Sequence, residues 1–379
     1  MVNGLSCFFE LAFSVTTFDF RVRYSDLVAG KDLHEEDNFV MKRLPFVFML
    51  LIGLIFHDVI PVSNPECASA EEFLVKFATL APEGSTWMNH MRKLDKAIRE
   101  RSKGQVGFRV YAGGVAGDEL DVLKKIRIGQ IHCAGFSGVG FGQILPAVRV
   151  LDLPFLFRDY QEVDLVHGDL QGFFADQFRE RGFEFLAWAE VGNVHLFSQS
   201  PIAKVSDMAR LKVWAWTGDP IAKETFSAMG TNPILLAIAD VTTALNTGMI
   251  DTVYAPPLGA LALQWNAYTK FMTSLPLAHS TGAVLIARSF YDKIPADLQK
   301  MLKEEFQRAM NTLALELRGQ TEESTAVMQK SGMRVLPMPN EADLKEFYKV
   351  HDEVAQALAG KVYPKELLNR VNGILTRAR

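Results

Sequence analysis

Two stretches of the chain, residues 122–138 and 241–257, follow one pattern, and this repeat limits the folds open to the sequence more than any other feature. They read VLKKIRIGQIHCAGFSG and VTTALNTGMIDTVYAPP. In each, a predicted helix ends at a glycine, Gly129 or Gly248, that can take the left-handed conformation, and a buried strand follows two residues later. The pattern predicts two similar halves, although a chance likeness between two helix–glycine–strand units remains the alternative.

Short apolar runs alternate with longer amphipathic ones from Glu71 onward. The runs that read as strands are 73–80, 107–112, 131–136, 183–190, 194–198, 211–216 and 251–255. This alternation predicts an α/β architecture with largely parallel sheets. At about 150 residues per domain, 379 residues suggest two domains or one large one.

Residues 295–330 lack a helix breaker apart from Pro295 at the start and Gly319. A continuous helix of that length would exceed about 50 Å, which is longer than one lobe of this size. We therefore expect one helix that ties two lobes together. A pair of helices broken near Gly319 is the alternative.

A secretory leader pattern begins at Met41 rather than at the first residue. Lys42 and Arg43 precede the apolar run 44–56, and Ala68-Ser69-Ala70 offers a cleavage site. The run is shorter than the roughly 20 residues that span a bilayer. We predict that residues 41–70 are a signal peptide, that residues 1–40 are a non-native extension, and that the mature protein is periplasmic. An uncleaved anchor is the alternative.

The composition argues against several classes of protein. A net charge of −4 with 49% hydrophobic residues gives no sign of nucleic-acid binding. No G-x-S-x-G motif occurs, and His132 and His195 stand apart from any serine or cysteine partner. The glycine-rich stretch 135–142 lacks a Walker lysine, and cleavage of the leader would leave Cys133 alone. We predict no catalytic residue, metal or cofactor.

Ligands of open α/β sheets collect at the carboxyl ends of strands. That rule brings Ser137–Gly140 and Tyr254–Pro257 to a shared cleft, and the strand containing Trp214 and Trp216 ends at the same edge. Two positions apart in a strand, the two indoles face the same side. We expect them to line the cleft, and burial of both against a helix is the alternative.

Over about residues 71–350 the chain resembles the solute-binding subunits of tripartite ATP-independent periplasmic (TRAP) transporters. The stretches that carry the resemblance are VLDLPFLFRD at 150–159, KVSDMARLKVWAW at 204–216, AMGTNPILLAIADVTTALNTGMIDTVYAPP at 228–257 and ARSFYDKIPADLQKML at 287–302. The resemblance implies a two-lobed periplasmic-binding-protein fold with a long helix across both lobes. It also implies closure on a small organic acid and delivery to TRAP membrane permease subunits.

This resemblance implies lobes at 71–191 plus 280–318 and at 192–279 plus 319–379, with strands that cross near 191–193 and 279–283. A binding protein of an ATP-driven transporter is an alternative function with the same two-lobed architecture. A sensor that reports ligand to a kinase is another.

The positions that carry ligand-binding polar groups in the family differ here. Trp214 stands where the family has its carboxylate-clamping arginine, and Val194 stands near a second frequent arginine. Trp216, Thr217 and Ala255 replace a proline and two asparagines. The chain therefore resembles an arginine-less branch, associated with tetratricopeptide-repeat lipoproteins, for which hydrophobic ligands are suspected.

The helix after this strand is predicted to begin with Asp219 as N-cap and Pro220 at its first position, which leaves no free N–H group for a ligand carboxylate. We expect a ligand with an aromatic or long apolar body, and a conventional carboxylate ligand is the alternative. The predicted ligand-binding residues are Trp87, Ser137, Gly138, Val194, Trp214, Trp216, Thr217, Tyr254, Ala255 and Pro256.

Overall fold

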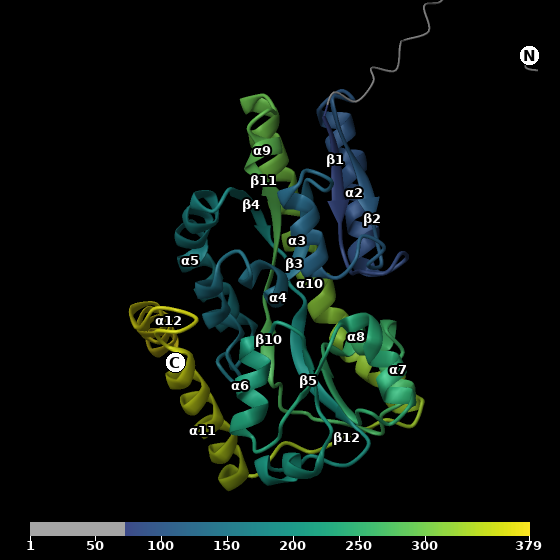
Figure 1. The fold of residues 1–379 in the computed structure, drawn as a ribbon, viewed down its shortest axis with the longest axis vertical. Coiled ribbons are helices and arrows are strands. Elements are labelled where there is room, and N and C mark those ends of the chain that lie inside the picture. The colour runs from purple at the N-terminus through teal and green to yellow at the C-terminus, as the bar shows by residue number, and fades with distance from the viewer. Residues whose placement is uncertain (1–72) are drawn as a thin grey trace, which may run out of the picture. The chain divides into compact units, whose positions relative to one another are not determined.

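The computed structural model describes residues 73–379, so the predicted extension and signal peptide lie outside the described residues. A five-stranded sheet forms one half of this part of the chain, in the upper part of Figure 1. Its order is β2-β1-β3-β11-β4. The strands are β1 (Phe73–Ala78), β2 (Val106–Tyr111), β3 (Cys133–Ser137), β4 (Phe183–Trp188) and β11 (Gly282–Ala287).

The second sheet is built around β5 (Gly192–Ser198). Its other strands are β8 (Thr252–Ala255), β9 (Phe271–Met272), β10 (Ala278–Ser280) and β12 (Arg334–Val335). A separate pair joins β6 (Trp214–Trp216) to β7 (Ile234–Leu236). All seven sequence-predicted strands are present, with shifted ends.

The expectation of largely parallel sheets is wrong. β1 pairs in parallel with β2 and β3, but β11 runs antiparallel to β3 and β4, and β5 runs antiparallel to β8, β9 and β10. The cause is the crossing between the halves, since only Thr281 separates β10 in the second sheet from β11 in the first. A strand that enters a sheet from the opposite half runs antiparallel to the strands that it joins.

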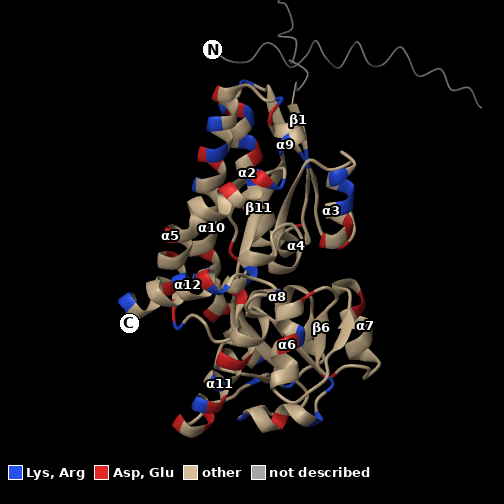
Figure 2. Ribbon diagram, turned by 60° about the vertical axis from the view of Figure 1, so that its left-hand side comes forward, with Lys and Arg blue, Asp and Glu red and all other residues tan. Residues whose placement is uncertain are grey.

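Helices cover both sheets. They are α2 (Thr86–Arg101), α3 (Glu119–Arg127), α4 (Gly138–Gly142), α5 (Tyr160–Glu180), α6 (Pro220–Ala228), α7 (Val241–Asn246), α8 (Pro257–Ala262), α9 (Arg288–Tyr291), α10 (Ala296–Lys330), α11 (Glu341–Leu358) and α12 (Lys365–Ala378). Short 3₁₀ helices are η1 (Pro146–Asp152), η2 (Val205–Arg210), η3 (Ile238–Asp240) and η4 (Trp265–Ala267). Residues of both charge signs are interspersed along α2 and α11, whereas in α3 the acidic residues lie in the first turn and the basic residues in the last (Figure 2).

The pattern shared by residues 122–138 and 241–257 has the predicted local structure in both stretches. Gly129 follows α3 with φ +74°, and Gly248 follows α7 with φ +69°. A buried strand then begins in each case, β3 at Cys133 and β8 at Thr252. The left-handed backbone needs glycine, because a side chain there would strain it.

The long helix α10 runs unbroken through Gly319 for 35 residues, or about 52 Å. It packs on α2 and β4 of the first half and on α8 and β5 of the second. At the crossing between the halves, Arg318 of α10 donates to both carboxylate oxygens of Glu190 at 2.7–3.0 Å. One helix therefore spans both halves, and the alternative of two shorter helices is wrong.

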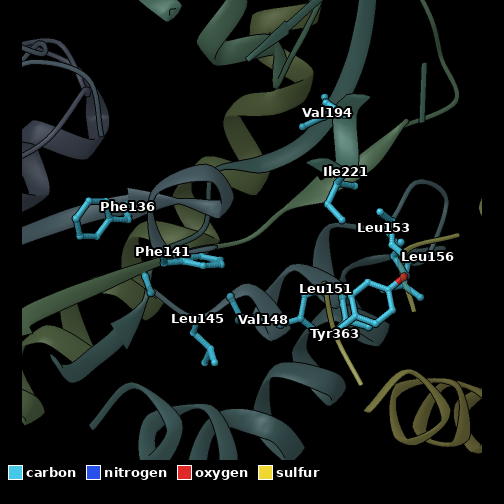
Figure 3. Packing of buried hydrophobic residues seen from close by; sticks show 14 of the residues in the cluster. Phe136, Phe141, Leu145, Val148, Leu151, Leu153, Leu156, Val194, Ile221 and Tyr363 are labelled. Atoms are coloured by element: carbon cyan, nitrogen blue, oxygen red, sulfur yellow. The ribbon is translucent and has the colours of Figure 1, made fainter. Parts of the chain in front are cut away.

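The core is continuous across the two halves. Figure 3 shows one cluster in which Phe136 and Phe141 share a core with Val194 and Ile221. Cys133 is fully buried in a second cluster, as expected of a core cysteine. No helix among residues 73–379 is long and apolar enough to cross a membrane.

The C-terminal helix α12 packs on α5, where Arg370 pairs with Asp169 at 2.7 Å and Arg379 with Glu162 at 2.8 Å. The expected division of the chain puts all of 319–379 with the second lobe. The contact places the end of the chain beside α5, and the expected division into lobes stays a prediction.

Candidate functional site

A cavity of about 200 Å³ opens at the edges of the two sheets. It is bounded by the end of β3 and the start of α4 on one side, and by β6, β8 and the start of α6 on the other. Most of its wall is apolar. Such a concave, mostly apolar space with a few polar groups is typical of small-molecule sites.

Aromatic rings form one wall of this first cavity. The ring of Trp214 stacks on that of Tyr254, with 4.9 Å between centroids, and meets the edge of Trp265 at 5.3 Å. Trp214 is only 2% exposed, and its Nε1 donates to the Leu236 carbonyl at 3.1 Å. It is at once a cavity wall and a core residue, so the two alternatives posed by the sequence do not exclude each other.

Trp216 connects the two halves. Its Nε1 donates to Oδ2 of Asp118 at 3.0 Å, and Asp118 is the N-cap of α3 in the first half. The backbone N–H of Trp216 donates to the Tyr254 hydroxyl at 3.3 Å. These bonds fix the indole between the first cavity and a second one.

The second cavity, of about 240 Å³, lies beside the first. The walls that the two cavities share are Ser137, Val191, Trp216, Ile238, Pro256, Gly259 and Leu263. Trp87 closes its far side and stacks on Phe77 at 5.9 Å. The two cavities therefore adjoin, and Trp216 is part of the wall of both.

The structure gathers most of the sequence-predicted site residues around these spaces. The first cavity is lined by Ser137, Gly138, Val194, Trp214, Trp216, Tyr254, Ala255 and Pro256. Trp87 lines only the second, and Thr217 lines neither. Thr217 lies past the end of β6, where its N–H bonds to the Leu236 carbonyl.

The sequence reasoning missed a buried charged cluster in the wall of the first cavity. Arg149 of η1 is 5% exposed, and its Nη2 lies 2.6 Å from Oδ1 of Asp219, the N-cap of α6. Its Nε lies 3.1 Å from Oδ2 of Asp152. The description of the cleft as arginine-less is wrong, because Arg149 reaches the first cavity from η1, an element other than the strands that carry Trp214 and Val194.

A signal for this cluster was present in the sequence. Arg149 and Asp152 are charged residues three apart in the otherwise apolar run VRVLDLPFLF. Charges buried in such a run need partners. Burial raises the pKa of Asp152 to about 7, although Arg149 and the N–H of Thr281, a donor at 3.0 Å, oppose that shift.

Glycines make room for the buried charges. A Cβ on Gly138 would lie 2.2 Å from Oδ2 of Asp152, and one on Gly140 would lie 2.6 Å from Oε2 of Glu119. Neither position can carry a side chain without moving a buried carboxylate. This close approach accounts for Gly138 and Gly140 in the glycine-rich stretch 135–142.

Glu119 ties α3 to the end of β3. Its Oε1 accepts from the N–H of Ser137 at 2.7 Å, and its Oε2 accepts from the Ser137 hydroxyl at 2.8 Å and the N–H of Gly140 at 2.7 Å. Burial nevertheless raises the pKa of Glu119 to about 7. A buried acid thus holds the loop that forms the floor of both cavities.

The two histidines considered as catalytic candidates line neither cavity. Nδ1 of His195 lies 2.8 Å from the Thr273 carbonyl, and burial lowers the pKa of His195 to about 4. The ring of His132 stacks on Phe290 at 3.9 Å. Within residues 73–379, no group of His, Cys, Asp and Glu side chains is placed to hold a metal ion.

The fold and the cavity between its halves define a two-lobed binding protein, and comparison with known proteins gives the family. The family model described as bacterial extracellular solute-binding protein, family 7, matches residues 77–361. The chain belongs to this family.

Two curated relatives illustrate the range of the family. The chain is 22% identical to the C4-dicarboxylate-binding periplasmic protein DctP of Rhodobacter capsulatus over 300 residues, which cover 78% of this chain and 90% of the relative. It is 26% identical to the 2,3-diketo-L-gulonate-binding periplasmic protein YiaO of Escherichia coli, over 58% of this chain and 67% of the relative.

Solved structures share the fold. A TRAP periplasmic solute-binding protein from Desulfovibrio salexigens with bound orotic acid superposes with a TM-score of 0.76 at 21% identity, covering 81% of this chain and 100% of that one. One from Shewanella oneidensis with bound succinate gives 0.75 at 18% identity, covering 80% and 99%. The expected fold, with two lobes and a long helix, is confirmed. The expected function as a solute-binding protein is also confirmed.

Proposed function

We propose that the protein captures a small organic molecule with an aromatic or long apolar body in the two adjoining cavities and delivers it to TRAP membrane permease subunits. The observation that carries this proposal is the first cavity, whose wall combines Trp214, Trp216 and Tyr254 with small residues of α4. Stacking on aromatic rings favours an apolar or aromatic ligand over a small dicarboxylate.

The proposed ligand contacts are the cavity-lining residues predicted from the sequence. Trp214 and Tyr254 would hold one face of the ligand, and Ser137 and Gly138 would face them from the first half. Trp87 would contact a ligand long enough to enter the second cavity. Thr217 does not line either space and is not part of this proposal.

The two sheets with their helices would move as lobes. The connections between them are short, with β4 leading into β5 and β10 into β11. Closure about these connections would bury the ligand, and opening would release it to the permease. A tetratricopeptide-repeat lipoprotein is a further proposed partner, which follows only from the family resemblance of the clamp positions.

Export of the protein would remove residues 1–70 by cleavage after Ala70. N-terminal sequencing of the mature protein tests this part, and a mature chain that begins at or before Phe56 would contradict it.

Mass spectrometry of the small molecules that co-purify with the exported protein tests the function itself. We expect one molecule per chain, with an aromatic or extended apolar part. Repeated preparations without any bound molecule, and without a change in tryptophan emission on addition of periplasmic extract, would contradict the proposal.

A further inference from the structure

The charged side chains in the wall of the first cavity already have partners within the protein. Arg149 lies between the carboxylates of Asp152 and Asp219. Oδ1 of Asp219 also accepts from the N–H groups of Ile221 and Ala222 at 3.0 and 3.1 Å. Asp219 is 7% exposed and Arg149 is 5% exposed, so the pair is almost fully buried.

The same holds for the second cavity. Glu119 accepts three hydrogen bonds from Ser137 and Gly140. Glu190 is paired with Arg318. Glu190 therefore has a counter-charge, and the oxygens of Glu119 are occupied by internal hydrogen bonds.

Three buried polar atoms of residues that line the first cavity make no hydrogen bond to a described residue: Arg149 Nε, Asp152 Oδ2 and His279 Nε2. The first two lie 3.1 Å apart in an ion pair, so only the histidine nitrogen has neither a hydrogen bond nor a counter-charge. His279 is 2% exposed, and its Nδ1 lies 3.0 Å from the Asn193 Oδ1, an acceptor that requires the proton on Nδ1. Its Nε2 is then an acceptor, and it has no hydrogen-bond partner among the described residues. Burial lowers the pKa of His279 well below its usual range, so the ring is neutral.

We infer that the ligand is an uncharged molecule with a hydrogen-bond-donating group such as a hydroxyl, and that Asp219 excludes carboxylates by occupying Arg149. This inference rests on the proposed function and narrows its ligand class. A ligand carboxylate would enter an apolar space in which the guanidinium of Arg149 is already paired with two carboxylates, and burying an unpaired charge is costly. The carboxylate that pairs with Arg149 belongs to Asp219, at the start of α6, and not to a ligand.

The test compares three probes that share a body and differ in charge: 3-phenylpropan-1-ol, 3-phenylpropanoate and 3-phenylpropylamine. Binding to protein dialysed free of small molecules is measured at pH 6.0 by calorimetry and tryptophan emission. We expect the alcohol to bind at least tenfold more tightly than either charged probe. A carboxylate or amine that binds as tightly as the alcohol would overturn the inference.

Asp219→Asn tests the role of the ion pair, since asparagine is also a good N-cap but leaves Arg149 with one carboxylate fewer. We expect affinity for 3-phenylpropanoate to rise about tenfold, with affinity for the alcohol changed by less than threefold. Asp159→Asn is the matched control, because Asp159 caps α5 and lines neither cavity. If no probe binds the wild type, a gain of carboxylate binding in Asp219→Asn still supports the inference and its absence overturns it.

The comparison of wild-type protein with the three probes needs no variant and stands if Asp219→Asn fails to fold. The co-purified molecule separates this inference from the proposed function. A bound carboxylate with an aromatic body would leave the proposed function intact and overturn the inference. A complete absence of bound molecules would count against the function.

Discussion

Nε1 of Trp216 lies 3.0 Å from Oδ2 of Asp118 and joins a strand of the second half to the first helix turn of α3 in the first half. Near it, Gln143 Nε2 donates to the Gly218 carbonyl at 3.2 Å, and Arg149 bonds to Asp219. Three polar contacts thus close the rim of the first cavity across the two halves. In this arrangement the rings that would hold a ligand also hold the halves together.

We predict that the protein is more compact with ligand bound than without it. Separation of the halves would break the rim contacts, and the short connections between the sheets would act as hinges. Small-angle scattering of the stripped and the saturated protein measures the radius of gyration, which should fall on binding. An identical profile at saturation would argue against lobe closure.

Trp214→Ala is expected to reduce the free energy of unfolding by about 3–5 kcal/mol, as for other large buried aromatic residues. The side chain is 2% exposed and stacks on Tyr254. Trp214→Phe keeps a stacked ring and loses the bond to the Leu236 carbonyl, so it should cost about 1–2 kcal/mol. Urea titrations measure both, and a cost below about 1 kcal/mol for the alanine variant would mean that Trp214 is not part of the core.

The pair of Arg149 and Asp219 should show strong coupling in a double-mutant cycle. Asp219→Ala leaves a buried guanidinium with one carboxylate fewer and removes a helix cap, which should cost about 3–5 kcal/mol. Arg149→Met combined with Asp219→Ala should cost less than the sum of the two single variants, because neither charge is then left alone. Additive costs in urea titrations would show that the pair does not interact.

The position of Glu119 gives the protein's stability a dependence on pH. Because burial raises its pKa from 4.5 to about 7, the folded state holds a proton that the unfolded chain has lost between those values. The stabilisation from this group is full below about pH 4.5 and disappears as the pH rises through 7, by up to about 1.4 kcal/mol per pH unit.

Glu119→Gln cannot ionise, so the difference in unfolding free energy between wild type and variant should shrink as the pH rises from 5 to 7.5. Asp152 and the buried histidines titrate in both proteins, and their contributions cancel in this difference. Parallel curves for the two proteins would contradict a raised pKa at Glu119.

Local pattern was sufficient to predict much of the fold. Glycine after a periodic apolar helix gave both copies of the pattern shared by residues 122–138 and 241–257, and the absence of breakers gave the long helix through Gly319. Strand direction was not predictable in the same way, because pairing of β11 depends on which half the chain has just left. That is a relation between segments about 150 residues apart, which no window of sequence contains.

Some residues of the site could likewise be predicted from local sequence, and others could not. Trp214, Tyr254 and Ser137 were predictable because each lies in a strand that ends at the cleft edge. Arg149 was not, since its partner Asp219 is 70 residues away and was recognised only for its local role as a helix cap. When the two residues of a buried ion pair are far apart in the chain, neither can be distinguished in the sequence from a charged residue on the surface.

Filling the cavity tests the central claim, that the ligand site lies between the two halves. Gly259 of α8 lines both cavities, and a Cβ there would meet only the Pro256 Cδ, at 3.7 Å. Gly259→Leu should therefore fill the space without strain and without loss of helix stability. Gly172→Leu is the matched control, a helix glycine of α5 with nothing within 4 Å of an added Cβ.

Native mass spectrometry of these proteins, purified side by side, measures the bound small molecule directly. The account predicts that wild type and Gly172→Leu carry the same molecule, while Gly259→Leu is folded, has an unfolding midpoint no lower than wild type, and carries none. A folded Gly259→Leu protein that retains the molecule at wild-type occupancy would contradict it.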